Sequence, residues 1–244
     1  MIWTAANAPW GKVSVRLSVV MPVYNEAARI EQAVTQVLAA PVDDEIELLA
    51  VDDGSTDGTA AVLERLAAEE SRIRLLRHER NQGKGAALQT GFAAAAGDVV
   101  LIQDADLEYD PADYPRLLAP VRDGRADVVL GSRFIGDSHR VLYFWHYVGN
   151  CMLTLLSNVM SGLNLTDMEA GYKVFRREVL AGFRLRSRRF GIEPELVQKV
   201  ARGRWRVYEV AITYNGRTYA EGKKITWRDG LAAAWHIVRF RIAD

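Results

Sequence analysis

Short apolar runs alternate along the first half of the chain with segments of helical periodicity. The runs that predict strands are 17–23, 45–51, 73–76, 99–102 and 127–130, and the helical patterns cover 27–40, 59–70, 86–96 and 112–121. Each of the first four strands is thus followed by a helix, which is the order of β-α-β units. The pattern predicts an α/β fold with a mostly parallel central sheet and helices on both of its faces.

The regular alternation stops near Gly131, and the next segment, 141–160, is rich in Leu, Tyr, Trp, Phe and Met. Polar residues such as Asn150 and Asn158 interrupt it, whereas a membrane-crossing helix needs about 20 predominantly apolar residues. We therefore expect a helix that is buried or that faces a membrane without crossing it.

The last third of the chain combines basic and aromatic residues. The arginine-rich segment 176–189 has two equally good interpretations. It is either the solvated face of a helix or a surface that binds anionic lipid. A strand is expected at 206–214 and a final helix at 231–242. That helix either docks on the domain or lies at a bilayer interface.

Composition narrows the class of protein. With 244 residues, 49% hydrophobic and 25% charged, the chain has the profile of a globular protein built from one large domain or one domain with an appendage. Its 31 basic and 31 acidic residues give a net charge of +0, so charge provides no argument for nucleic-acid binding. Cys151 is the only cysteine, and residues 1–12 lack a secretion signal; both features favour a cytoplasmic location.

The chemistry is concentrated where an apolar run, 99–102, ends in acidic residues. Asp104, Asp106 and Glu108 would leave the carboxyl end of a buried strand, the edge at which α/β sheets bind ligands. Their oxygens suit Mg²⁺ or Mn²⁺, which can in turn hold a diphosphate. Alone the motif is weak, and without further support a solvated acidic turn before the helix at Pro111 explains it better.

Other polar strand ends should meet at the same edge. Asp53 follows the second strand and could accept hydrogen bonds from a base or ribose, while Asp57 is suited to start the next helix. The loop 81–85, Asn-Gln-Gly-Lys-Gly, precedes another helix, and its Lys84 makes it a candidate cradle for phosphate. Neither a Walker loop nor a dinucleotide-binding glycine pattern is present, which argues against both of those enzyme classes.

Taken in order, these segments resemble glycosyltransferase family 2, the inverting nucleotide-sugar enzymes with the GT-A fold. The resemblance is carried by segments 20–26, 51–57, 81–85 and 104–107. It narrows to polyprenyl-phosphate sugar transferases similar to dolichyl-phosphate mannose or glucose synthases, on segments 131–134, 167–173, 191–195, 214–217 and 221–225. It extends from about residue 17 to residue 234. Relatives often carry Phe-Arg where this chain has Tyr172 and Lys173.

The resemblance implies a role for each matching residue. Donor binding is expected of Pro22, Tyr24, Glu26, Asp53, Lys84, Asp104, Ala105 and Asp106. The expected metal ligands are Asp104, Asp106 and Glu108, with Asp106 the main one. The acceptor phosphate would be bound by Arg133, His146, Arg217 and Lys223, with Arg140 and Lys224 as further candidates. Asp104, Asp106, Arg133 and Asp167 would serve catalysis, Asp167 by orienting its neighbours.

The implied organisation is an N-terminal extension (1–16), a GT-A domain (17–225) and a C-terminal amphipathic helix (226–244). Within the GT-A domain, 17–133 would bind the nucleotide sugar and 134–225 the acceptor. The implied function is metal-dependent, inverting transfer of a hexose from GDP-mannose or UDP-glucose to a polyprenyl phosphate, by a peripheral protein at the cytoplasmic face of a membrane.

Two alternatives stay open from the sequence. The acceptor could be a hydroxyl of a soluble sugar or polysaccharide, in which case Asp167 or Glu193 would be the candidate general base. The chain could also be a non-catalytic protein that binds nucleotide sugars. Processive polymer synthesis is disfavoured, because the sequence has neither convincing transmembrane helices nor a Gln-x-x-Arg-Trp motif.

Overall fold

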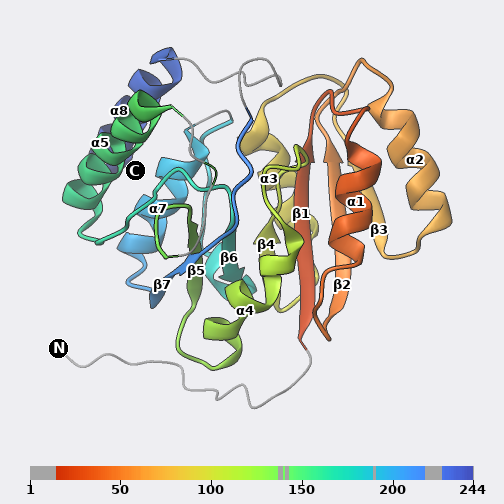
Figure 1. Cartoon of the computed structure of the whole chain (residues 1–244), viewed down its shortest axis with the longest axis horizontal. Coiled ribbons are helices and arrows are strands. Elements are labelled where there is room, and N and C mark those ends of the chain that lie inside the picture. The colour runs from red at the N-terminus through yellow and green to blue at the C-terminus, as the bar shows by residue number, and fades with distance from the viewer. Residues whose placement is uncertain (1–14, 137–139, 141–142, 189–190, 218–226, 244) are drawn as a thin grey trace.

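A computed structural model describes residues 15–136, 140, 143–188, 191–217 and 227–243 (Figure 1). In this part of the chain, seven strands form one sheet in the order β3-β2-β1-β4-β6-β5-β7. The strands are β1 Arg16–Val23, β2 Glu45–Asp52, β3 Ile73–Arg77, β4 Val99–Ile102, β5 Val128–Ser132, β6 Lys173–Arg176 and β7 Val207–Ala211. All neighbouring strands pair in parallel except β6, which is antiparallel to both β4 and β5.

Helices cover both faces of the sheet. Their bounds are α1 Ile30–Leu38, α2 Thr59–Glu69, α3 Lys84–Ala94, η1 Pro111–Asp113, α4 Tyr114–Arg122, α5 Phe144–Ser161, α6 Arg177–Ala181, α7 Ile192–Arg202 and α8 Trp227–Ile242. One hydrophobic core joins the sheet to α1, α2 and α4, and a second joins its other face to α3, α6, α7 and α8. Helices α5, α7 and α8 contact one another on that second face.

Strand periodicity explains the two cores. In β1, Leu17, Val19 and Met21 point into the first core and Val20 into the second, because successive side chains of a strand face opposite sides. All four are fully buried. A sheet covered on both faces produces the continuous apolar runs seen in the sequence.

The structure confirms the predicted α/β fold and most of its elements. The strand β6 and the helix α7 are elements that the sequence pattern did not predict. The strand gives little signal in the sequence. Its first and last residues, Lys173 and Arg176, are buried although they are charged, so the segment lacks the apolar run of a central strand. The helical reading of 176–189 is wrong beyond Ala181, since α6 is only five residues long.

The long apolar helix predicted after Gly131 is present as α5, which has 18 residues. Within the described part of the chain, no helix is both long enough and apolar enough to cross a membrane. The final helix, α8, begins at Trp227, four residues earlier than the pattern suggested.

Candidate active site

Most of the predicted site residues lie at one edge of the sheet, the upper edge in Figure 1. The parallel strands β1, β2, β4 and β5 have their carboxyl ends there. Because β6 runs the opposite way and its first residue, Lys173, pairs with Ile102 at the end of β4, the turn before β6 reaches the same edge. The fold therefore brings residues 24–26, 53, 84, 104–108, 133 and 167–172 to one side of the molecule, as expected for an α/β ligand site.

The loops after β1 and β2 are tied together by hydrogen bonds. The Asn25 backbone N–H donates to the Ser55 hydroxyl at 3.0 Å, and the Thr56 N–H donates to Asn25 Oδ1 at 2.8 Å. The Glu26 N–H donates to the Thr59 hydroxyl at 2.9 Å. Beside them, Tyr24 is 41% exposed, and Pro22 is half-buried at the end of β1. The segment expected to hold the nucleoside is thus rigid, with an aromatic ring open to solvent.

Asp53 organises the loop that carries Lys84. Its carboxylate accepts hydrogen bonds from the backbone N–H groups of Gln82 (2.9 Å) and Gly83 (2.7 Å) and contacts His78 Nδ1 at 2.7 Å. The His78 ring, which the sequence reading did not single out, also reaches the Thr90 hydroxyl. Asp53 is buried by these contacts, so its proposed contact with a base or ribose stays a prediction.

Lys84, the first residue of α3, bridges two carboxylates. Its Nζ lies 2.8 Å from Asp104 Oδ1 and 3.0 Å from Glu193 Oε1 in the first turn of α7. Burial by itself would lower the pKa of Lys84, but the charges of Asp104 and Glu193 outweigh it and raise the pKa well above its usual range. Lys84 therefore keeps its positive charge, and Glu193 is one of the two carboxylates that pair with its ammonium group.

The acidic turn after β4 is covered by Arg217. The Arg217 Nη2 lies 2.8 Å from Asp106 Oδ2, and its Nε donates to Glu108 Oε1 at 2.8 Å. The Tyr214 hydroxyl donates to the other Glu108 oxygen at 3.0 Å. Arg217, expected to bind the acceptor, thus contacts two of the three expected metal ligands.

The acidic turn has the donor set for a hard divalent cation. Burial raises the pKa of Asp106 to about 7, and the charges of Asp104 and Glu108 add to the effect while Arg217 opposes it. Carboxylates that crowd one another in this way suit Mg²⁺ or Mn²⁺. Within the described residues, no three His, Cys, Asp or Glu side chains form a ready-made metal cage, since Asp104 turns to Lys84 and the others to Arg217. The assignment of Asp104, Asp106 and Glu108 as metal ligands stays a prediction. The chemistry of their oxygens fits such a role.

Arg133, directly after β5, is locked to Asp167. The guanidinium makes a two-point ion pair with the carboxylate, at 2.6 Å and 2.7 Å, and the Arg133 backbone N–H donates to it as well. Asn150 of α5 bonds to both partners, and the Tyr214 ring lies 5.1 Å from the guanidinium. Burial opposes the charge of Arg133, but Asp167 outweighs it and raises the pKa well above its ordinary value.

The other expected acceptor residues are less closely gathered. His146 lies in the first turn of α5 with its ring 5.3 Å from the Tyr143 ring, and Arg140 donates to the Gly216 carbonyl at 2.9 Å. Lys223 and Lys224 lie outside the described residues. Lys173 is buried and donates to the carbonyls of Met168 and Ala170, so it closes the turn before β6.

The turn 167–172 lies directly against the acidic residues. A Cβ added at Gly171 would clash with the Asp104 carboxylate and the Tyr109 ring, so only glycine permits this approach. The Glu209 carboxylate accepts the backbone N–H groups of Thr166 and Asp167 and holds the start of the turn. Glu169, in the middle of the turn, was not singled out by the sequence, where one glutamate in a loop carries no signal.

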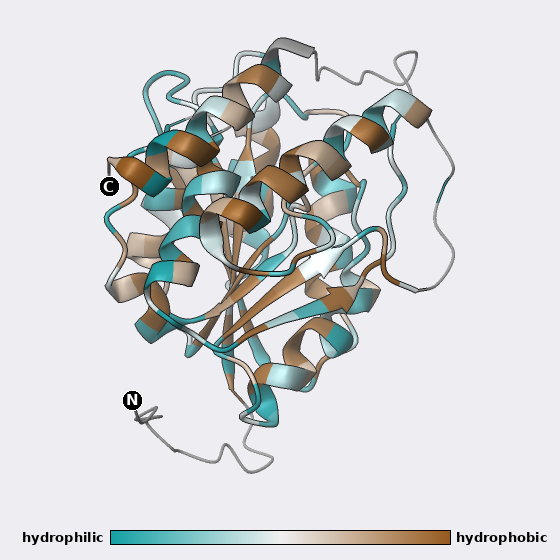
Figure 2. Ribbon diagram, turned by 90° about the vertical axis from the view of Figure 1, so that its left-hand side faces the viewer, coloured by the Kyte–Doolittle hydropathy of each residue, from teal (hydrophilic) through white to brown (hydrophobic). Residues whose placement is uncertain are grey.

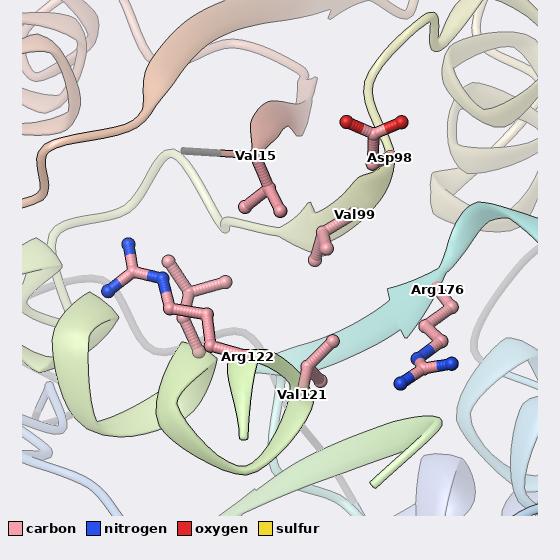
Figure 3. A pocket seen from close by; sticks show the side chains of 7 residues that line it. Val15, Asp98, Val99, Val121, Arg122 and Arg176 are labelled. Carbon is pink, nitrogen blue, oxygen red and sulfur yellow. The ribbon is translucent and has the colours of Figure 1, made fainter. Parts of the chain in front are cut away.

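A small pocket at the opposite edge of the sheet lacks comparable chemistry (Figure 3). Val15, Val99, Leu118 and Val121 form its apolar walls. Its charged residues have partners elsewhere: Arg122 pairs with Asp44, Arg176 lies 3.7 Å from Asp127, and Asp98 accepts the Arg16 N–H. The carboxyl edge is therefore the candidate active site.

Comparisons with known proteins agree with this geometry. The sequence profile of glycosyl transferase family 2 matches residues 18–183. The undecaprenyl-phosphate mannosyltransferase of Micrococcus luteus is 31% identical over 93% of this chain and 99% of that relative. A low-salt glycan biosynthesis hexosyltransferase of Haloferax volcanii is 32% identical over 95% of this chain, which spans 54% of that relative's length.

Among solved structures, the fold is similar to that of glucosyl-3-phosphoglycerate synthase from Mycobacterium tuberculosis in complex with Mn²⁺, UDP and glucosyl-3-phosphoglycerate. The TM-score is 0.70, the sequence identity is 23%, and the match covers 98% of this chain and 85% of that one. The likeness supports the GT-A architecture of the sheet and its helices.

Proposed function

The chain belongs to glycosyl transferase family 2 and is a glycosyltransferase, and from this premise we propose that it transfers a hexose from a nucleotide sugar to a polyprenyl phosphate at a membrane surface. The donor would lie over the loops after β1, β2 and β4. The lipid phosphate would approach from the side of Arg133 and α5.

The observation that carries the proposal is the double role of α5. On its inner side, Asn150 bonds to both Arg133 and Asp167. On its outer side, the exposed residues are large and apolar: Phe144, Trp145, Met152, Leu155 and Val159, each at least 65% exposed. One helix thus links a cationic group suited to phosphate with a surface suited to lipid.

Helix α8 extends this surface. Leu231, Trp235 and Ile242 are each at least 63% exposed on α8, which contacts α5. Figure 2 looks onto the side of the molecule that carries α5 and α8 and shows apolar segments along both helices. The 18 residues of α5 include no Asp, Glu, Lys or Arg, which is unusual for a helix facing water. These features support binding at the membrane interface.

The pairing of the candidate bases favours a phosphate acceptor. Asp167 is bound to Arg133, and Glu193 is bound to Lys84, so each carboxylate already serves a neighbouring cation. A phosphate acceptor is anionic and needs no base. One of its oxygens forms a bond to the anomeric carbon from the face opposite the leaving group, and the bond to the nucleoside diphosphate breaks with both electrons leaving on the diphosphate.

Different residues would act on the leaving diphosphate, the acceptor phosphate and the divalent cation. Lys84, which pairs with Asp104, would offset charge on the leaving-group side, and Arg133, oriented by Asp167, would hold the acceptor phosphate. Asp106, with Asp104 and Glu108, would hold a divalent cation, which when bound neutralises charge developing on the diphosphate.

A matched pair of acceptors tests the proposal. The purified protein is incubated with Mg²⁺ or Mn²⁺, a panel of nucleotide sugars, and either a polyprenyl phosphate or the polyprenol of the same chain length. We expect a glycosylated lipid phosphate, detected by mass spectrometry, and no product from the alcohol. Transfer to the alcohol or to a soluble sugar, with none to the phosphate, would overturn the proposed acceptor. Binding of nucleotide sugar without transfer to any acceptor would overturn transfer itself.

A further inference from the structure

Glu169 has a buried carboxylate oxygen for which the described residues offer no hydrogen-bond partner. Its Oε1 is shielded from solvent, whereas Asp104 and Asp167 pair with cations and Glu209 accepts backbone N–H groups. A buried polar atom without a partner is costly, and natural structures retain few of them. Such an atom is explained when a ligand supplies the missing hydrogen bond.

The position of Glu169 indicates which part of a ligand it would meet. The turn 167–172 begins at Asp167, which holds Arg133, and ends near Gly171, which packs against Asp104. Glu169 lies midway along this turn. Along the chain it therefore lies between Asp167, which holds the residue assigned to the acceptor phosphate, and Gly171, which packs against the diphosphate side; the charges of Arg133 and Asp167 act on its carboxyl group.

The geometry of the transfer reaction indicates which part of the donor would lie beside the turn that carries Glu169. During transfer the anomeric carbon lies between the acceptor oxygen and the leaving oxygen, so the hexose occupies the space between the two phosphate sites. Hexose hydroxyls are hydrogen-bond donors, and a carboxylate is acceptor-only when ionised. We infer that Glu169 accepts a hydrogen bond from a hydroxyl of the donor hexose and so helps select the sugar; this inference rests on the proposed function.

The electrostatic surroundings of Glu169 make its ionised form costly when no ligand donates a hydrogen bond to it. Burial and the charge of Glu193 raise the pKa of Glu169 to about 7, while Lys173 and Arg133 oppose this shift. Lys173 donates to the Met168 and Ala170 carbonyls, so its ammonium stabilises the backbone of the turn beside Glu169. The carboxyl group is thus held in place by its backbone and left with an unsatisfied oxygen.

Comparing the binding of a nucleotide sugar with that of its nucleoside diphosphate measures the contribution of the hexose to affinity. Binding of a nucleotide sugar and of the corresponding nucleoside diphosphate is measured by calorimetry for the wild type, Glu169→Gln and Glu169→Ala. We expect Glu169→Ala to weaken nucleotide-sugar binding by about 10- to 100-fold while nucleoside diphosphate binding stays within about twofold. Glu169→Gln, which keeps an acceptor oxygen, should give a smaller loss. Glu178→Gln, a change at an exposed glutamate of α6, should alter neither ligand.

Deoxy-sugar donors complete the test. The donor that lacks the contacted hydroxyl should bind the wild type as weakly as the natural donor binds Glu169→Ala, and the variant should not weaken it further. An equal loss for nucleotide sugar and nucleoside diphosphate, or a loss for neither, would overturn the inference. Failure of the wild type to glycosylate polyprenyl phosphate would overturn the proposed acceptor, and the binding comparison would still test Glu169.

Discussion

The Arg133 guanidinium and the Asp167 carboxylate form a two-point ion pair, with Nε–Oδ2 at 2.6 Å and Nη2–Oδ1 at 2.7 Å. Two parallel hydrogen bonds fix the plane of the guanidinium, which a single contact would not do. Asp167→Asn keeps the shape of the side chain but removes the charge. We expect turnover to fall by about 10- to 100-fold, because Arg133 loses its orientation at the reacting phosphate.

Donor binding separates this positioning role from general damage to the site. In Asp167→Asn, the affinity for nucleotide sugar should stay within about twofold of the wild type, since the proposed donor site is on the side of Lys84 and Asp104. The control Asp123→Asn removes a surface carboxylate that pairs with Arg125. It should leave both turnover and the affinity for nucleotide sugar unchanged. Unchanged turnover in Asp167→Asn would contradict the assigned role.

Arg217 contacts the acidic turn at Asp106 and Glu108, so it should compete with a divalent cation for the same oxygens. In Arg217→Ala, we expect Mn²⁺ to bind the substrate-free protein about 3- to 10-fold more tightly, because no guanidinium has to be displaced. Calorimetric titration with MnCl₂ measures this directly.

The matched control for Arg217→Ala is Arg65→Ala, which removes an equal charge from an exposed position on α2. Its Mn²⁺ affinity should equal that of the wild type. Weaker Mn²⁺ binding in Arg217→Ala would mean that Arg217 supports the cation site instead of competing for it.

Glu169 should make the stability of the protein depend on pH. Burial and Glu193 raise its pKa from the ordinary 4.5 to about 7, so the folded state holds a proton that the unfolded chain releases over this interval. The free energy of unfolding should therefore fall as the pH rises from 4.5 to about 7, by up to about 3 kcal/mol from this group. Glu169→Gln removes the group and should be the more stable protein above pH 7.

Chemical denaturation of the wild type and Glu169→Gln at several pH values checks this. Asp106, whose pKa is also raised to about 7, contributes equally to both proteins, so the difference between them isolates Glu169. Curves that stay parallel from pH 4.5 to pH 8 would show that Glu169 is not perturbed by folding.

The sequence predicted that Lys84 and Asp104 lie near each other, because their places in the α/β order put them at the same edge of the sheet. Asp104 follows an apolar run, Lys84 starts a helix, and parallel strands place both at one edge, where they lie 2.8 Å apart. Local patterns suffice here, since each residue lies next to a recognisable strand or helix end.

The surroundings of Arg217 and Glu169 were harder to predict, because they depend on β6 and on chain segments that are distant in sequence. Arg217 contacts Glu108 across 109 residues of sequence, from a stretch without helical or strand periodicity. Glu169 owes its position to the antiparallel β6, whose buried Lys173 conceals the strand. The sequence gives the charge of these residues but not their partners.

The apolar face of α5 provides the last prediction. Trp145 and Met152 are 77% and 67% exposed on a helix without charged residues, and burying them in the interfacial region of a bilayer is favourable. Replacing either with glutamate should reduce co-sedimentation with vesicles of anionic phospholipid by about tenfold. Ala61→Glu, on the exposed side of α2, places the same charge elsewhere and should have little effect.

Transfer assays on two acceptors show whether the apolar face of α5 is needed for access to membrane lipid or for the transfer reaction itself. A short-chain polyprenyl phosphate that is soluble in water should be glycosylated by Trp145→Glu at the wild-type rate, because Asn150, Arg133 and Asp167 lie on the other side of α5. Transfer to a long-chain polyprenyl phosphate in vesicles should fall together with vesicle binding. Equal loss on both acceptors would indicate that α5 is distorted, and equal sedimentation of variant and wild type would exclude this face as the membrane contact.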